Sequence, residues 1–213
     1  MSSEESSPGF AAYFQLILGA LFGVSVGAVL AAVHLLAQPV KLVEEMPDEI
    51  KPAQHYVLQG RTGGGDAWKY KATELQEGTG EVTLLETELN RWAASFKTEY
   101  PEEKSSLYVE PQRPLFRLEG DKLMVSAPAQ SGFGSWTRLI TLSLEGDFVP
   151  DAAILRIQPE KLYLGSLRVP GPAKDFVWKR ISSSYTIDEE FESLWSIVGT
   201  ANIQESQLVL TAK

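Results

Sequence analysis

The stretch from Phe10 to Leu36 constrains this chain most, because it contains no Asp, Glu, Lys or Arg. As an α-helix rising about 1.5 Å per residue it would be about 40 Å long, which exceeds the ~30 Å hydrocarbon core of a bilayer. A cleaved signal peptide would have a basic start and a shorter apolar run, whereas residues 1–9 carry no Lys or Arg. The sequence therefore predicts a polar tail over residues 1–9 and an uncleaved transmembrane helix over residues 10–36.

Small residues recur at four-residue spacing along this helix. They are Gly19, Gly23, Gly27 and Ala31. Residues spaced in this way lie on one side of an α-helix, and the absence of large side chains there allows another helix to approach closely. The alternative is that glycine is simply frequent in single spans. We predict a helix-helix contact at this face, with membrane protein partner helices or with a second copy of the chain.

The orientation of the span is open from charge alone. Lys41 and Lys51 follow the apolar stretch and no basic residue precedes it. The positive-inside bias would then place the C-terminal domain in the cytoplasm. The count is small, however, and long domains are translocated largely regardless of this bias.

Composition excludes several function classes. The chain has 28 acidic and 19 basic residues, for a net charge of -9, which argues against nucleic acid or a broad anionic membrane surface as partner. It has no Cys, and His55 is the one histidine outside the span, so neither a Cys- or His-rich metal site nor a Ser-His-Asp arrangement beyond that residue is available. We assign no catalytic residue, metal or cofactor, and expect a protein that is not an enzyme.

The region after the span divides into a linker and a domain. Residues 37–53 contain three prolines among acidic residues, which predicts an extended stalk, and residues 54–213 are long enough for one soluble domain. The glycine-rich segment 60–66 lacks the Gly-Lys-Ser/Thr ending of a phosphate-binding loop. We interpret it as a flexible turn before a helix that Asp66 caps.

A second helix is predicted within EVTLLETELNRWAASF. Its apolar face comprises Leu85, Leu89, Trp92, Ala93 and Phe96. We predict that Leu89, Trp92 and Phe96 anchor this helix on a sheet. Glu86 and Glu88 fall in its first turn, where negative charge interacts favourably with the helix dipole. A catalytic pair is the weaker interpretation, because residues two apart on a helix point to different sides.

From Leu107 onward the apolar residues alternate with polar ones, which indicates antiparallel strands. Turns are expected at Gly120-Asp121 and Gly146-Asp147. The residues expected on the covered face are Leu115, Leu139, Leu142, Leu144, Ile154 and Ile157. The predicted fold class is α+β, in which one transmembrane helix precedes a curved antiparallel sheet packed with two to four short helices.

Two helical segments follow the meander, over residues 173–181 and 188–198, and a last hairpin or edge strand is expected over residues 202–211. In the first segment three basic residues surround Phe176 and Trp178. These are Lys174, Lys179 and Arg180. They could touch lipid headgroups, although a solvated helix face is the interpretation that such a pattern favours.

The helix LLETELNRWAAS, the phrase LGSLRVPGP and the terminal QLVLTAK strand resemble bacterial single-pass or lipid-anchored extracytoplasmic domains of unknown function that share a T-E-x-E-[Leu/Ile]-Asn helix. More remotely they resemble the tubular lipid-binding, BPI-like fold. Glu88, Leu89 and Asn90 match that helix motif, whereas Leu85 stands where an N-capping Thr or Ser is usual. The resemblance implies an extracytoplasmic domain with a curved sheet that can leave an apolar groove.

Two functions follow from these observations. The first is a single-pass, non-enzymatic accessory or structural protein of the bacterial cytoplasmic membrane, which docks on a membrane complex through its glycine face and its tethered domain. The alternative is a membrane-anchored module that binds a lipid or another apolar ligand. A solvent-open apolar groove of several hundred Å³ would favour the ligand, and a filled core would favour docking.

Overall fold

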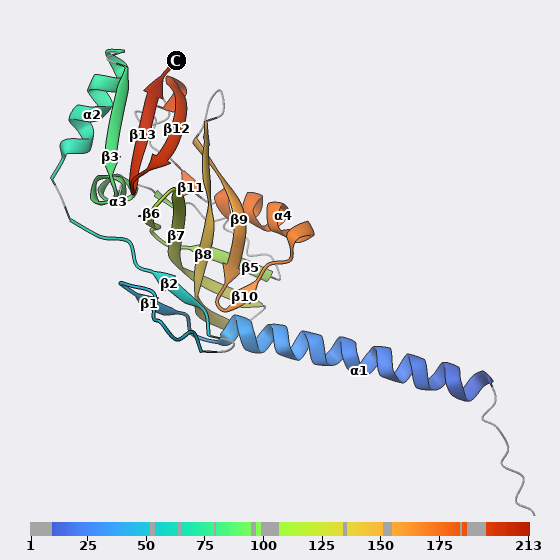
Figure 1. The fold of residues 1–213 in the computed structure, drawn as a ribbon. Coiled ribbons are helices and arrows are strands. Elements are labelled where there is room, and N and C mark those ends of the chain that lie inside the picture. The colour runs from blue at the N-terminus through green and yellow to red at the C-terminus, as the bar shows by residue number, and fades with distance from the viewer. Residues whose placement is uncertain are drawn as a thin grey trace, which may run out of the picture.

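A computed structural model shows an α+β protein, as the sequence predicts (Figure 1). The structure describes residues 10–51, 54–63, 65–78, 80–94, 97–98, 107–133, 136–150, 155–183, 185–186 and 195–213. Helix α1 (Phe10–Ala37) leads into antiparallel sheets that carry three short helices among these residues. Within α1, the segment Tyr13–Ala37 is long and apolar enough to cross a membrane.

The main sheet is antiparallel and has six strands. Its members are β5 (Leu107–Pro111), β6 (Leu115–Glu119), β7 (Lys122–Phe133), β8 (Trp136–Pro150), β9 (Leu155–Leu164) and β10 (Leu167–Arg168). The order is β10-β9-β8-β7-β5, and β6 pairs with β7 beside β5. Strands that follow one another along the chain are thus mostly neighbours in space, which is the meander predicted from the alternating residues.

A second antiparallel sheet has the order β12-β13-β3. It contains β3 (Glu81–Leu85), β12 (Val198–Gln204) and β13 (Gln207–Ala212). Glu205 and Ser206 join β12 to β13 with φ angles of 50° and 64°, which is the backbone conformation of a two-residue type I′ hairpin turn. The predicted C-terminal hairpin is therefore confirmed.

Two short strand pairs complete the sheets. β1 (Lys41–Val43) pairs in parallel with β2 (Tyr56–Leu58), and β4 (Lys97–Thr98) pairs with β11 (Tyr185–Thr186). Residues 41–43 were expected in a stalk that separates the domain from the bilayer. In the structure they form β1, which pairs with β2 through backbone hydrogen bonds.

Three helices cover the sheets. They are α2 (Ala67–Gln76), α3 (Glu86–Ala93) and α4 (Gly171–Ser182). The side chains of Leu75, Leu89, Trp92, Leu123 and Leu162 are among the most buried in the core between helices and strands. α4 matches the first helix predicted after the meander. Of the second, residues 188–194 lie outside the described residues, Trp195 and Ser196 are helical, and Val198 opens β12.

Two predictions within the main sheet are wrong. Gly146-Asp147 lies inside β8 rather than at a turn, at a bulge where a Cβ on Gly146 would lie only 2.2 Å from the Gln158 carbonyl oxygen. Glycine is needed there for close approach of β9.

Leu139, expected on the covered face, is 70% exposed, because Ile140, Leu142 and Leu144 occupy the covered face of β8. Ile154 lies outside the described residues.

The start of α3 also differs from expectation. Leu85, placed on the apolar helix face, is the N-cap residue and is exposed. Its backbone N–H donates to Glu88 Oε2 at 2.8 Å, so the carboxylate supplies one half of a capping box although Leu85 has no side-chain acceptor. Asp66 precedes α2 but makes no capping hydrogen bond, and its carboxylate lies 3.4 Å from Lys69 Nζ.

Candidate functional site at the membrane-helix junction

The glycine positions of α1 are free of contacts from other parts of the described chain. The residues Gly19, Gly23, Gly27 and Ala31 are exposed on this helix. A Cβ built at any of the three glycines meets nothing within 4 Å in the described chain. The predicted helix-helix face is thus accessible along the span, while the rest of the helix surface presents large apolar side chains.

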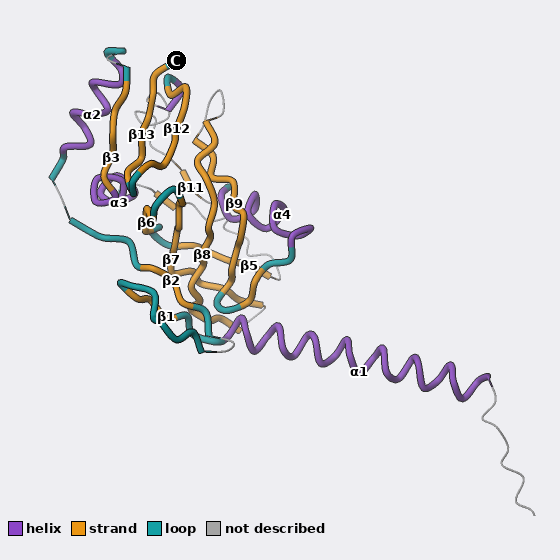
Figure 2. The backbone as a smooth tube through the Cα atoms, in the orientation of Figure 1, coloured by secondary structure: helices purple, strands orange, loops and turns teal. Residues whose placement is uncertain are grey.

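The C-terminal end of α1 is fixed to the domain by backbone contacts. The N–H of Ser166, in the turn between β9 and β10, donates to the Leu35 carbonyl at 3.0 Å. The N–H of Gly165 donates to the Thr141 carbonyl on β8 at 2.8 Å. A helix end leaves its last carbonyls without partners inside the helix, so this turn satisfies one of them and attaches α1 to the main sheet (Figure 2).

Gly165 is required for this attachment. Its φ is +60°, in the left-handed region that glycine adopts without steric cost. A Cβ at this position would also lie 2.5 Å from the Leu36 carbonyl oxygen. Backbone geometry and close packing therefore both select glycine in the LGSLRVPGP segment.

A polar cluster lies near this junction, where His55, the residue before β2, contacts β8 and β9. The ring of His55 stacks on Tyr163 with centroids 4.0 Å apart, and His55 Nε2 lies 3.0 Å from Ser143 Oγ. Burial lowers the pKa of His55, and the negative charge of Glu145 opposes that shift. Glu145 in turn accepts a hydrogen bond from Lys161 Nζ at 2.5 Å, which raises the pKa of Lys161. The side chains of this cluster bond to or stack on one another, and His55 is its one imidazole. We therefore interpret the cluster as a packing contact rather than a catalytic site.

α3 attaches to the sheet through Asn90 and Glu86, polar side chains for which the sequence predicted no partner. Asn90 is fully buried, and its side chain accepts from the Phe116 N–H at 2.6 Å. Its Nδ2 donates to the carbonyls of Phe116 at 2.7 Å and Arg61 at 2.9 Å. The amide thus completes the backbone hydrogen bonds of β6 on the side away from β7.

Glu86 continues the same pattern one turn earlier. Its carboxylate accepts from the N–H of Leu118 at 3.0 Å and of Arg61 at 2.6 Å, with Arg117 Nη1 3.6 Å away. Glu86 and Asn90 are four residues apart and share one face of α3. They cover the edge of β6 that would otherwise be open for another strand.

Glu88 points to a different side and links α3 to α2. Its Oε2 accepts from Lys71 Nζ at 2.7 Å. Leu89 and Trp92 are buried beside it, and the Trp92 ring centroid lies 5.6 Å from that of Trp195. Phe96, the third predicted anchor, lies outside the described residues. The four-residue spacing of Glu86 and Asn90, which puts both on one helix face, was the available signal for these buried polar contacts.

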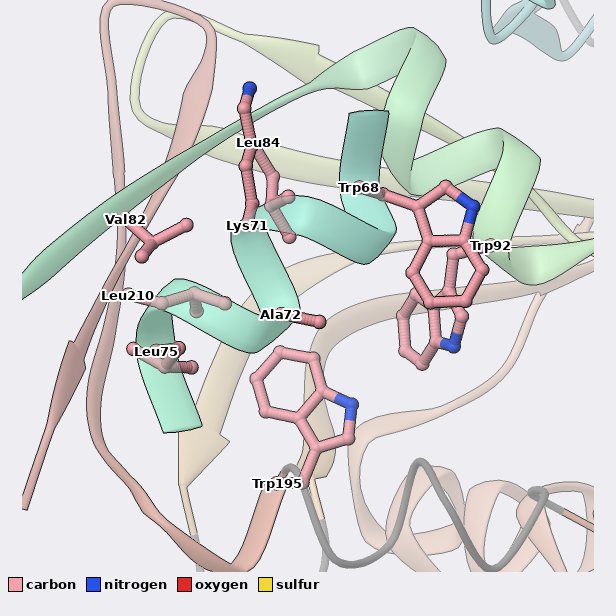
Figure 3. A pocket seen from close by; sticks show the side chains of 9 residues that line it. All are labelled: Trp68, Lys71, Ala72, Leu75, Val82, Leu84, Trp92, Trp195 and Leu210. Carbon is pink, nitrogen blue, oxygen red and sulfur yellow. The ribbon is translucent and has the colours of Figure 1, made fainter. Parts of the chain in front are cut away.

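A small apolar pocket opens beside these tryptophans (Figure 3). It lies between α2, β3 and β13, with Trp68, Trp92 and Trp195 on its walls and a volume of about 20 Å³. A volume of this size holds about one water molecule. It is far below the several hundred Å³ that a lipid or drug-sized ligand needs.

The described residues contain no group of three or more His, Cys, Asp or Glu side chains placed to hold a metal ion. Comparison with known proteins gives no relationship: no family model, curated protein or solved structure matches this chain. The geometry of the chain itself therefore carries the functional argument.

Proposed function

We propose that this protein is a single-pass membrane anchor with a tethered domain, and that it serves as a non-enzymatic accessory or structural subunit of a membrane protein complex. The observation that carries the proposal is the contrast along α1. Its small-residue face has no neighbour within the described chain, while its C-terminal end is fixed to the domain through Ser166. A partner helix bound to this face would therefore also orient the domain.

The energetic basis is close helix approach. Lipid tails are as apolar as leucine, so helices associate in a bilayer through packing and interhelical hydrogen bonds rather than through the hydrophobic effect. Gly19, Gly23 and Gly27 remove side chains from one side of α1 and allow backbone-to-backbone contact there. The partner is either a helix of another membrane protein or a second copy of α1.

The alternative function, a lipid-binding module, has less support. The pocket beside Trp92 and Trp195 holds about 20 Å³, so this pocket would have to widen to take an acyl chain. Docking through the span requires no such rearrangement. The remote resemblance to tubular lipid-binding domains remains a reason to include lipid analysis in the experiment.

The test is native purification from membranes in mild detergent, followed by mass spectrometry of co-purifying proteins and lipids. Gly23→Ile places a branched side chain in the centre of the proposed contact and should remove the partner, or the self-association, while insertion persists. Val24→Ile changes a neighbouring side of the helix and is the matched control. Equal partner recovery from both variants would contradict the proposal.

We further propose that the domain lies outside the cytoplasm of a bacterial cell. Protease added to spheroplasts should then remove the domain and leave a cytoplasmic control protein intact. Protection of the domain until lysis would show the opposite orientation, which the positive-inside count of Lys41 and Lys51 favours.

A further inference from the structure

Helix α4 presents an exposed apolar and basic surface that the core does not use. Phe176 is 76% exposed. Pro172, Ala173, Lys179 and Arg180 are exposed as well. The opposite face is held to the sheet, where Ile181 is buried and Trp178 Nε1 donates to the Ile157 carbonyl at 2.6 Å. The orientation of Phe176 is thus set by the packing of the other face.

This surface begins close to the end of the membrane-spanning helix. Gly171, the first residue of α4, follows Ser166 by five residues, so the two lie within about 18 Å of each other even if the chain between them is fully extended. Ser166 itself is bonded to Leu35 in the last turns of α1. Figure 1 shows α4 projecting from β9 toward the side on which α1 leaves the domain.

We propose that α4 rests on the surface of the bilayer that α1 crosses, with Phe176 inserted at the headgroup boundary and Lys179 and Arg180 toward lipid phosphates. The inference rests on the membrane anchoring in the proposed function, but not on the accessory role. The interfacial layer is about 5–7 Å deep on each side of the hydrocarbon. A side chain beside the end of a span is therefore within reach of it.

The chemistry of α4 fits this surface better than it fits water. Interfacial helices place Phe, Trp or Leu toward the acyl boundary and Lys or Arg toward anionic headgroups. α4 has three basic residues (Lys174, Lys179 and Arg180) and one acidic residue (Asp175), although the whole chain has a net charge of -9. The long basic side chains can extend along the surface to reach phosphate oxygens.

The chain offers a clean test because it has no cysteine. We compare three variants of the full chain, each with one cysteine: Phe176→Cys, Tyr70→Cys and Val24→Cys. Each cysteine is labelled with the environment-sensitive dye NBD. The protein is reconstituted at one copy per nanodisc of phosphatidylcholine and phosphatidylglycerol. Tyr70 is the matched control, since it is also 76% exposed but lies on α2, which Figure 1 places far from α1.

The expected result is blue-shifted emission at positions 24 and 176, with quenching by lipids that carry a doxyl group, and neither effect at position 70. Quenching at position 24 without quenching at position 176 would overturn the inference and leave the anchoring intact. A blue shift at position 176 without lipid quenching would also overturn it, because protein rather than lipid would then cover Phe176. Absence of quenching at position 24 would contradict the anchoring and the inference together.

Discussion

Helices α1 and α3 differ in both composition and burial: α1 is apolar and exposed, whereas α3 contains polar residues that are buried. α1 carries no charged residue between Phe10 and Leu36, yet its large apolar side chains are exposed along most of its length. α3 carries Glu86, Glu88 and Asn90, and all three are buried. The two helices have side chains suited to different surroundings: the exposed apolar surface of α1 suits lipid, and the buried polar side chains of α3 suit the edge of β6.

The two helices also differ in whether the described chain supplies contacts to their distinctive side chains. In α3 the buried Glu86, Glu88 and Asn90 each bond to a group of the same chain, such as the backbone of Phe116 and Leu118. Burial of these groups is tolerable because their hydrogen bonds are made. The glycine face of α1 has no such neighbour within the described chain. We infer that α3 stabilises the domain and that α1 connects it to something else.

The largest effect is expected from Trp92→Ala, which removes the anchor of α3. Trp92 is 3% exposed and packs against Trp195 and Phe116. Truncation of a buried aromatic side chain leaves a cavity and should lower the free energy of unfolding by about 3–5 kcal/mol. Urea denaturation of the full chain in mild detergent measures this. Tyr70→Ala, at an exposed position, should change the free energy of unfolding little. Equal effects of the two changes would contradict the role of Trp92 as the buried anchor of α3.

Asn90→Ala should destabilise the domain by about 2–4 kcal/mol, because the buried N–H and carbonyl of Phe116 would each lose a partner. The same denaturation measurement applies. Arg91→Ala on the exposed side of α3 is the control, since its contact to Asp66 spans 3.9 Å at the surface and such pairs contribute little. If the Asn90→Ala variant were as stable as the Arg91→Ala variant, the hydrogen bonds from Asn90 to the backbone of β6 would not contribute to stability.

A smaller effect is expected from pH. Burial lowers the pKa of His55 below its ordinary value of 6.5, so the folded state binds fewer protons than the unfolded state between the two pKa values. The contribution of neutral His55 is therefore present above pH 6.5 and is lost as the pH falls through the lowered pKa. His55→Asn should remove this part of the pH dependence. The same slope of stability against pH in both proteins would contradict the linkage.

Local patterns predicted most of the fold. The apolar run gave α1, the alternation after Leu107 gave the meander, and the C-terminal pattern gave the hairpin around Glu205. The errors involve contacts with distant residues. Gly146 resembles a turn glycine in sequence, but its role depends on the backbone of Gln158 in the next strand.

The same limit applies to the buried polar residues of α3. Helical spacing could place Glu86 and Asn90 on one face, but their partners at Arg61 and Phe116 come from other parts of the chain. In α1 the four-residue spacing places Gly19, Gly23 and Gly27 on one side of the helix, and a partner helix at that side is our proposal.

The most direct test of the account measures stability and partner recovery in one preparation of the Gly23→Ile variant. A Cβ at position 23 meets nothing within 4 Å in the described chain, so the free energy of unfolding should equal that of the parent. The co-purifying partner should be lost, while Val24→Ile keeps both properties. Retention of the partner by Gly23→Ile, or a loss of domain stability comparable to that of Asn90→Ala, would contradict the division of roles between α1 and α3.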